Sequence, residues 1–379
     1  MTCISNNIIE GLKPVFLMVL IQFIFAGVSI LFKLVASTGM SLTVLMAYRY
    51  FFSSAFMVPL AYFVERERKP KITMKVLFQA FLCGLFGATI QQNLFVEGVA
   101  LAGATYATAM YNLIPAVTYI LAVCFGLERL NIKTKTGKAK VLGPLVGVSG
   151  AMILTFYRSI EIHLWPTIVN LMKNKPKNAA TSHIFGTSLA FGTCLSYSIW
   201  LIIQARMSAK FPWHYTSAAL MSVMACIQST IFAVCMERDN WSRWKLGWNI
   251  KLFTAVYVGV VASGIPWVLT AWVLRLKGPL YASSFNPLFL VIVAIAGSLF
   301  LDEKLYLGSV IGALLIVLGL YIVLWGKGKE LKSNVEQKHK NDPLEEVEPL
   351  EIVTTKQING KSADDKSVDD GNDIKCGDS

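Results

Sequence analysis

The sequence predicts an all-α membrane protein with ten transmembrane helices, arranged as two inverted five-helix repeats. Hydrophobic residues make up 55% of the chain and charged residues only 15%, whereas a soluble domain typically carries about 25% charged residues. Apolar runs recur at about the 20-residue length that a helix needs to cross the hydrocarbon core of a bilayer. The second half of the chain also repeats residues of the first half at a constant offset of 175 positions.

The apolar runs place the helices one after another along the chain. Continuous runs of this length favour helices over the strands of a membrane barrel, which span about ten residues and alternate in character. The N-terminal residues lack the pattern of a cleaved signal peptide, so we expect the first run to remain as a spanning helix. The predicted spans are residues 14–35, 41–64, 76–98, 104–126, 138–157, 184–204, 215–236, 252–273, 280–301 and 305–325.

Lysine and arginine near the span ends predict the orientation of the helices. If both termini lie in the cytosol, 18 of these residues fall on the inner side and 9 on the outer side, mostly through the first half of the chain. We therefore expect residues 1–13 to be cytosolic and residues 158–183 to form an outer loop. This loop would join a first repeat, residues 14–157, to a second repeat, residues 184–329, and a cytosolic tail, residues 330–379, would follow.

The internal repeat predicts an inverted architecture. Nine residues are identical at the 175-residue offset, among them Gly84 with Gly259 and Gly103 with Gly278. Because each half holds five spans, an odd number, the second copy enters the membrane from the opposite side. Inverted repeats are typical of secondary transporters, whose substrate site lies near the membrane midplane between the copies.

The net charge of +12 is unevenly distributed. Residues 330–379 hold 13 acidic and 7 basic residues, a net charge of −6, so the preceding residues carry +18. The basic residues lie in short clusters between apolar runs, which fits anionic lipid head groups better than nucleic acid. The tail has few large apolar residues and is expected to be disordered.

The sequence contains no motif for catalysis or metal binding. Five of the seven cysteines lie inside apolar runs without CxxC spacing, and the four histidines fall in or beside loops or the tail. No nucleophile elbow, phosphate-binding glycine loop or zinc spacing occurs in a supporting context. We therefore expect no cofactor, no metal and no enzymatic activity. The expected partners are the lipid bilayer and a small-molecule substrate.

Two prolines interrupt predicted helices at corresponding positions of the two halves. In the fourth span Pro115 follows Tyr111 and Asn112, and in the ninth span Pro287 follows Asn286. Each proline lacks a backbone donor and so frees the carbonyl group four residues earlier. Broken helices at matched positions predict a transporter's substrate site, although a structural kink satisfied by neighbouring helices would give the same pattern.

Arg49 is a cation deep inside an apolar span. It lies eight residues into the second span, which corresponds to a depth of about 12 Å. A charge at this depth usually faces the interior of the bundle or a cavity. A substrate carboxylate, an ion pair with Glu97 and extension of the side chain to the outer surface each account for Arg49.

Two further polar groups are candidates for substrate contact. The third span contains Gln91 and Asn93 in a run of three amides, of which at most two can face one pathway because successive helical residues differ by 100°. Hydrogen bonds between helices are the alternative role. In the eighth span Trp267 and Thr270 share a helix face, for which helix packing is the alternative.

Two pairs of glycines predict close helix packing instead of chemistry. Gly143 and Gly147 are four apart in the fifth span, and Gly308 and Gly312 are four apart in the tenth. Small residues at this spacing let helix backbones approach closely in a membrane.

Several motifs resemble the plant nodulin-21-like branch of the drug/metabolite transporter superfamily. The resemblance covers nearly all of residues 14–330 and leaves out only the tail. The motifs that carry it are Gln92-Asn93-Leu94, the run from Ala107 to Ala116, the run ERDNWSRWKLGW from Glu237 to Trp248, and the run FLDEKLYLGSVIGALLIVLGLYIVLWGKGKE from Phe300 to Glu330.

The resemblance implies two EamA-type five-helix modules. It places the paired motifs of the family on Asn112 with Pro115 and on Asn286 with Pro287. The chain departs from the expected pattern in the eighth span, where Pro266 and Thr270 stand in place of an alanine and a glutamine. That departure weakens any assignment of the substrate by family.

The resemblance also implies a function. Members include the UMAMIT amino-acid facilitators of the plasma membrane and the "walls are thin" vacuolar auxin exporter. We therefore expect a facilitator or exporter of amino acids that works by alternating access, in the plasma membrane. A carrier of auxin or another aromatic acid, in the vacuolar membrane, is the alternative. A non-transporting membrane receptor or scaffold that signals through its acidic tail is an alternative of another class.

Overall fold

The chain divides into a body, Met1–Lys327, and a second unit, Gly328–Ser379. A computed structural model gives the arrangement of the body, and describes the second unit only over its helical residues 328–341. The described residues are 2–36, 41–66, 72–102, 104–128, 133–157, 161–162, 180–238, 244, 246, 250–300 and 305–341.

Helices follow the predicted spans in order, and a two-residue antiparallel pair joins β1 (Glu161–Ile162) to β2 (Leu305–Tyr306). The first half contains α1 (Thr2–Ala36), α2 (Leu42–Glu65), α3 (Met74–Gly84), the π-helical η2 (Leu85–Thr89), α4 (Ile90–Ala102), α5 (Ala104–Tyr111), α6 (Ile114–Cys124) and α7 (Lys135–Phe156). The second half contains α8 (Ala180–Lys210), α9 (His214–Met236), α10 (Ile250–Gly259), the π-helical η4 (Val260–Gly264), α11 (Ile265–Lys277), α12 (Pro279–Ser283), α13 (Asn286–Phe300) and α14 (Leu307–Asn341).

The ten predicted membrane spans are confirmed. Among the described residues, nine helical segments are long and apolar enough to cross a membrane, and the shorter apolar segment Leu12–Val28 lies in α1. Each segment overlaps one predicted span. The fold is therefore all-α, and the two-residue β pair is a local addition at a loop.

Two segments that we expected to lack regular structure are partly helical: the start of the tail, and the end of the outer loop, where α8 begins at Ala180. Helix α14 continues through Asn341, although we expected disorder from Glu330 onward. Extending an existing helix avoids the cost of nucleating a new one, and residues 331–341 contain no glycine or proline that would end it. Residues 342–379 of the predicted tail, and residues 163–179 of the predicted outer loop, lie outside the described residues.

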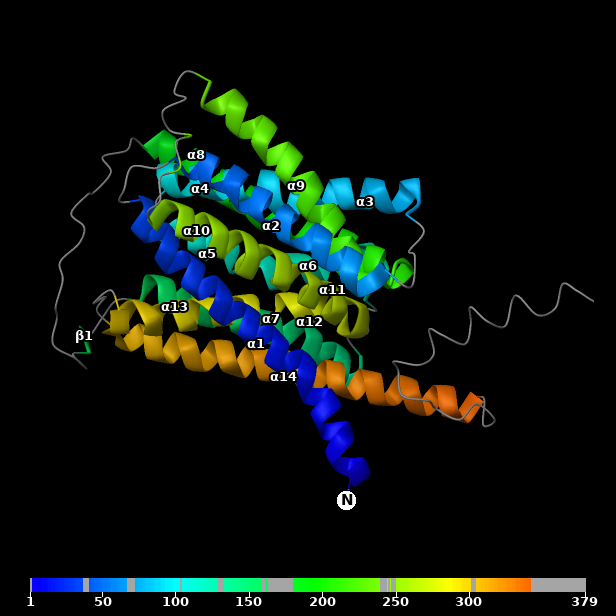
Figure 1. Cartoon of the computed structure of the whole chain (residues 1–379). Coiled ribbons are helices and arrows are strands. Elements are labelled where there is room, and N and C mark those ends of the chain that lie inside the picture. Colours follow the sequence, from blue (N-terminus) through cyan, green and yellow to red (C-terminus); the bar gives the residue numbers. More distant parts are fainter. Residues whose placement is uncertain are drawn as a thin grey trace, which may run out of the picture. The chain divides into compact units, whose positions relative to one another are not determined.

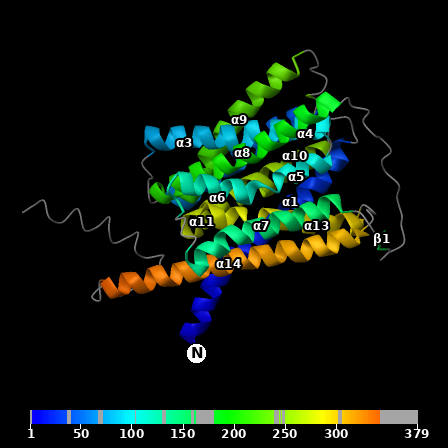
Figure 2. The ribbon, with the colours of Figure 1, turned by 180° about the vertical axis from the view of Figure 1, so that it is seen from behind.

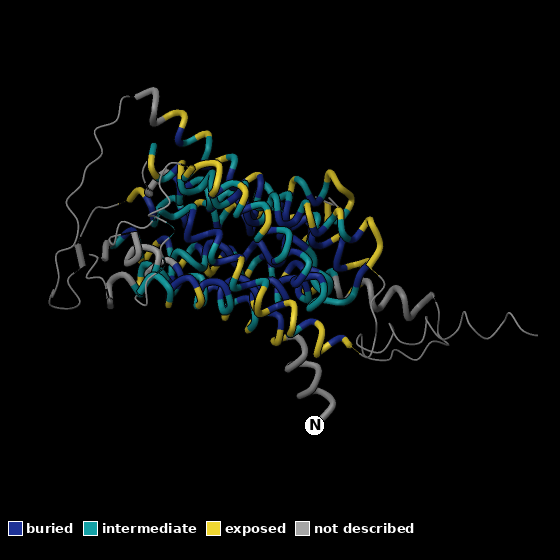
Figure 3. The backbone as a smooth tube through the Cα atoms, turned by 45° about the horizontal axis from the view of Figure 1, so that its top comes forward, coloured by how far each residue is buried: buried dark blue, intermediate teal, exposed yellow. Residues whose placement is uncertain are grey.

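The helices of the body lie alongside one another in layers. Helices α3, α8 and α9 form one side, α7 and α14 form the opposite side, and α5, α6, α10 and α11 lie between them (Figures 1 and 2). Buried residues concentrate where helices face each other, and exposed residues follow the outer faces (Figure 3). Large apolar side chains such as Phe63 and Leu314 are 73% and 68% exposed, as expected of a surface that faces lipid.

The backbone itself shows the inverted repeat. The π-helical segments η2 and η4 interrupt the third and eighth spans and begin 175 residues apart, at Leu85 and Val260. The glycine before each one contacts the second span of the other half. A Cβ atom on Gly84 would lie 3.0 Å from the backbone nitrogen of Ala225 in α9, and one on Gly259 would lie 2.5 Å from the carbonyl oxygen of a residue in α2.

Helices α2 and α9 are tied together at both ends by carboxylates. Glu65, the last residue of α2, accepts hydrogen bonds from the backbone nitrogens of Tyr215 (3.1 Å) and Thr216 (2.9 Å) in the first turn of α9. Glu237, directly after α9, accepts a 2.6 Å bond from the hydroxyl of Ser41, directly before α2. Since a helix N-terminus favours negative charge, Glu65 caps α9, whereas Glu237 lies at the start of α2 through the side chain of Ser41.

The predicted close packing at glycines of the fifth and tenth spans is confirmed, and the structure adds that these two helices, α7 and α14, pack on each other. A Cβ atom on Gly312 would lie 2.6 Å from the carbonyl oxygen of Gly150, and one on Gly319 would lie 2.7 Å from that of Gly143. A Cβ atom on Gly308 would overlap the carbonyl oxygen of Tyr157. The two helices therefore pack with their backbones in contact.

This seam offers a matched pair of variants. We expect Gly319→Ala to lower the thermal stability of the full-length protein by about 1–3 kcal/mol because the new methyl overpacks the seam. Gly147→Ala should be neutral or stabilising, because a Cβ atom there would meet nothing within 4 Å and alanine favours a helix. Thermal unfolding in detergent measures both, and equal effects would contradict backbone contact as the cause.

Candidate substrate site

Both predicted helix breaks are present. Helix α5 ends at Tyr111 and α12 ends at Ser283, the residues whose carbonyl groups the following prolines cannot bond. A two-residue turn follows each one before α6 or α13 begins. At the first break a backbone hydrogen bond spans three residues instead of the four of an α-helix, since the Leu113 N–H donates to the carbonyl of Met110 at 3.1 Å. The matched breaks thus place, inside the bundle, two carbonyl groups that the prolines cannot bond.

The asparagines at the two breaks have unused hydrogen-bond donors. Asn112 is 2% exposed and Asn286 is 6% exposed. Within the described part of the chain, neither side-chain amide nitrogen has a hydrogen-bond partner. The Asn286 amide does interact with the hydroxyl of Tyr197 in α8, but without the geometry of a full hydrogen bond. A buried donor left unpaired costs about 1–3 kcal/mol, so an acceptor on a ligand would stabilise both positions.

Aromatic rings surround this region. The Tyr111 ring contacts the rings of Phe95 (5.9 Å between centroids) and Tyr197 (5.7 Å), and Tyr197 contacts Trp200 at 5.0 Å. The indole nitrogen of Trp200 is buried and also has no partner among the described residues. A Cβ atom on Gly87 in η2 would lie 2.8 Å from this nitrogen, so the π-helical segment holds the indole in place.

Arg49 is buried and is held by the second π-helical segment. Its side chain is 5% exposed. The guanidinium donates to the hydroxyl of Ser263 at 2.6 Å and to the carbonyl oxygen of Ala262 at 3.5 Å, both in η4. It also lies over the Tyr50 ring at 5.3 Å, and this ring stacks on Trp267 at 5.8 Å. Neutral groups therefore position the cation without cancelling its charge.

The structure argues against two of the three alternatives for Arg49. Glu97 is exposed, and in the described part of the chain Arg49 forms no ion pair with it. A side chain that is 5% exposed does not extend to a surface. Contact with a substrate carboxylate is the alternative that remains as a prediction.

The remaining candidate residues differ in their hydrogen bonds, although most of them are buried. Gln91 and Thr270 are buried, at 4% and 6% exposure, and Pro115 and Pro287 are buried within their breaks. The amide nitrogen of Asn93 donates to its own helix, at the carbonyl oxygen of residue 89, at 2.7 Å. This bond serves a carbonyl at the end of η2, so Asn93 has a structural use.

Sequence reasoning missed the contribution of the sixth span. Tyr197 and Trp200 in α8 complete the aromatic cluster, but neither residue was recognised as facing inward. The polar residues Ser196 and Ser198 were the available signal. Ser196 donates to the carbonyl oxygen of Phe86 in η2 at 2.8 Å, and Ser198 accepts from a threonine of α6 at 3.1 Å.

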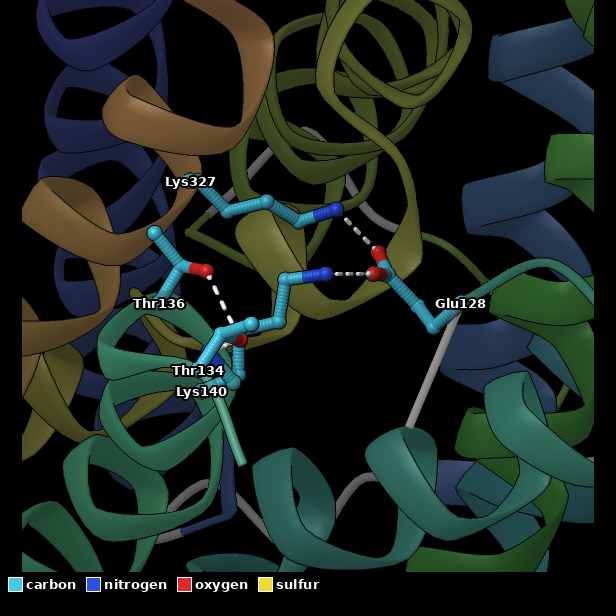
Figure 4. A network of polar contacts seen from close by, with 6 residues as sticks. Glu128, Thr134, Thr136, Lys140 and Lys327 are labelled. Atoms are coloured by element: carbon cyan, nitrogen blue, oxygen red, sulfur yellow. Dashed lines mark hydrogen bonds and ion pairs between the residues drawn. The ribbon is translucent and has the colours of Figure 1, made fainter. Parts of the chain in front are cut away.

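A buried ion cluster lies beyond the ends of the broken helices (Figure 4). The Glu128 carboxylate, 2% exposed, contacts the ammonium groups of Lys140 in α7, at 2.9 Å, and of Lys327 in α14. Gly278, directly before α12, has a φ of +85° that favours glycine, and a Cβ atom there would lie 3.2 Å from the carboxylate. The cluster thus joins the end of α6 to α7, α14 and the start of the second broken helix.

A helical membrane protein with inverted repeats, and with buried polar groups at paired helix breaks, has the architecture of a secondary transporter. Residues 12–156 and residues 184–325 each match the EamA-like transporter family. The chain belongs to this family and is a multi-pass membrane transporter.

Curated relatives and a solved structure agree with this assignment. Two WAT1-related proteins of Arabidopsis thaliana are 42% and 41% identical to the chain, over 87% and 85% of its length and 94% and 92% of theirs. A solved structure described as "Crystal structure of protein" superposes with a TM-score of 0.60 at 16% identity. It covers 82% of this chain and 97% of its own, and so shows the shared fold.

Proposed function

We propose that the protein is a facilitator or exporter of amino acids that works by alternating access between its two inverted repeats. The observation that carries the proposal is the pair of buried asparagines, Asn112 and Asn286, whose amide nitrogens have no partner among the described residues. They lie at matched helix breaks, where the substrate sites of inverted-repeat transporters lie.

The chemistry of the region fits an amino acid. Arg49 and the two asparagine amides are donors that a carboxylate would accept, with the charge-assisted bond to Arg49 the strongest. The carbonyl groups of Tyr111 and Ser283 are acceptors for an ammonium group, and aromatic faces also attract such a cation. The rings of the cluster would contact the substrate's side chain.

An auxin or another aromatic acid is the second candidate substrate. The stacked pair of Tyr50 and Trp267 lies next to Arg49, so a planar acid could place its carboxylate on the cation and its ring among these side chains. An acid without an ammonium group would leave the freed carbonyl groups at the breaks unused. For that reason we favour the amino acid.

Efflux from oocytes that express the protein tests the proposal. The cells are loaded in turn with radiolabelled amino acids, with the matching decarboxylated amines and with indole-3-acetate. We expect efflux of at least one amino acid above water-injected cells and no efflux of its amine. Efflux of indole-3-acetate alone would support the second candidate instead.

The same assay separates transport from a scaffold function. A chain that ends after residue 341 keeps every helix of the structure, so a transporter should retain its flux. A receptor or scaffold that signals through the acidic tail would lose its function. We propose the plasma membrane as the location, which a fluorescent fusion would distinguish from the vacuolar membrane.

A further inference from the structure

A groove on the outside of the body lies apart from the candidate substrate site. It runs between α7 and α14 near the N-terminus of α7, and has a volume of about 380 Å³. It begins where these helices pack on each other through small residues. A Cβ atom on Gly326 would lie 3.0 Å from that of Ala139 and 3.3 Å from the carbonyl oxygen of Thr136. The lining residues are Lys135, Lys138, Ala139, Leu142, Tyr321, Ile322 and Trp325.

The lining changes from cationic to apolar along the groove. Lys135, Lys138 and Leu142 lie on one face of α7 at spacings of three and four residues, and all three are exposed. Leu142 lies about 10 Å further along the helix axis than Lys135. The charges therefore gather at the end of the groove nearest the helix N-terminus, and the far end is apolar.

Helix α14 supplies aromatic side chains to the opposite wall. It runs antiparallel to α7, since Gly312 contacts Gly150 and Gly326 contacts Ala139. Trp325 is 39% exposed and lies toward the lysine end, whereas Tyr321, one turn deeper, is 64% exposed. Tryptophan and tyrosine are the side chains that proteins place at the level of lipid head groups.

We propose that this groove binds an anionic glycerophospholipid. Its phosphate lies between Lys135 and Lys138, where the N-terminus of α7 adds a favourable dipole. Its glycerol region contacts Trp325, and an acyl chain follows Leu142 and Tyr321 toward the membrane interior. In the predicted orientation this end faces the cytosol, whose leaflet carries the anionic lipids.

The apolar part of the groove argues for a lipid over a soluble anion. A free phosphate would use only the two lysines and would leave Leu142, Tyr321 and Ile322 without a role. Leu142 and Tyr321 belong to helices that are long and apolar enough to cross a membrane, so acyl chains are expected beside them. A ligand with a charged head and a long hydrocarbon chain is the occupant that matches both ends.

Photo-crosslinking of the full-length protein in phosphatidylcholine nanodiscs tests the proposal. A trace of phosphatidylserine with a photoactivatable acyl chain is added, and the labelled peptides are identified by mass spectrometry. We expect labelling of α7 and α14 around Leu142 and Tyr321. Since each basic residue near the surface contributes about fivefold to anionic-lipid binding, K135Q/K138Q should lower the labelling roughly thirtyfold, and K135R/K138R should retain it.

The matched control removes the same charge elsewhere. Lys75 and Lys210 are exposed, lie on the same predicted side of the membrane and are outside the groove, so K75Q/K210Q should leave the labelling unchanged. Equal loss in both double variants would overturn the site. So would equal labelling by photoactivatable phosphatidylcholine, or loss of labelling on addition of inorganic phosphate. Unchanged thermal unfolding of K135Q/K138Q before lipid is added shows that the variant is folded.

Discussion

Replacement of Arg49 by glutamine is expected to weaken the binding of carboxylated substrates by about ten- to a hundredfold, the value of a hydrogen bond to a charged group. The guanidinium is buried and is held by η4 through Ser263, so its charge is available to a ligand. Glutamine removes the charge and keeps a polar side chain. Concentration dependence of transport, measured with an amino acid and with its decarboxylated amine, should show a large loss for the first and a small loss for the second.

Two control variants distinguish recognition from structure. Ser263→Ala leaves the cation in place but loosens it, so we expect a smaller loss of affinity than for Arg49→Gln. Glu97→Gln should have no effect, because Glu97 is exposed. Equal losses for the acid and the amine in Arg49→Gln, or recovery when Glu97→Gln is added, would instead assign Arg49 to a structural ion pair.

Replacement of Glu128 by glutamine is expected to lower the stability of the folded protein by about 3–5 kcal/mol, the usual effect of removing one partner of a buried ion pair. Both Lys140 and Lys327 contact this carboxylate, and all three side chains are 10% exposed or less. The variant would leave two ammonium groups in the core without it. Thermal unfolding in detergent, together with the amount of protein at the cell surface, measures the loss.

A substitution of Lys140 is expected to have a smaller effect on stability than the substitution of Glu128. Lys140→Met leaves Glu128 in contact with Lys327, so it should cost less than Glu128→Gln. Glu97→Gln is the exposed control and should not change the unfolding temperature. If Glu128→Gln unfolds at the wild-type temperature, the cluster does not hold the ends of the broken helices together.

The fold could be predicted from the sequence because a bilayer imposes a simple rule on it. Each crossing needs a helix of nearly fixed length with few charges, so the apolar runs show where the helices lie. The 175-residue offset also anticipated a backbone feature, since η2 and η4 begin at exactly this spacing. No residue pattern in the sequence was recognised as a predictor of the π-helical geometry of these two segments.

The contacts between helices were harder to predict. Pro115 and Pro287 predicted the two breaks because proline acts on its own helix. The bond between Arg49 and Ser263 joins residues 214 positions apart, so it depends on how two spans pack. Most spans are apolar all round, and their pattern does not reveal which side faces the interior.

The burial of the charged residues in the ion cluster was also not predicted from the sequence. In the sequence Lys140 and Lys327 look like ordinary basic residues near span ends, and Glu128 like part of a loop. Their burial comes from the glycine seam that brings α7 against α14. Glu65 and Glu237 likewise lie at the ends of the second spans, and only the packing of α2 on α9 brings Glu65 to the N-terminus of α9 and Glu237 to Ser41.

The central claim is that the two broken helices form one substrate site, and a double-mutant cycle on transport tests it most directly. Apparent affinity is measured for Asn112→Ala, Asn286→Ala and the combined variant at matched surface levels. Residues that contact one ligand are coupled, so the account predicts that each single variant weakens affinity and that the effects are not additive. Unchanged affinity in both single variants at normal surface levels would contradict it, and the breaks would then be structural kinks.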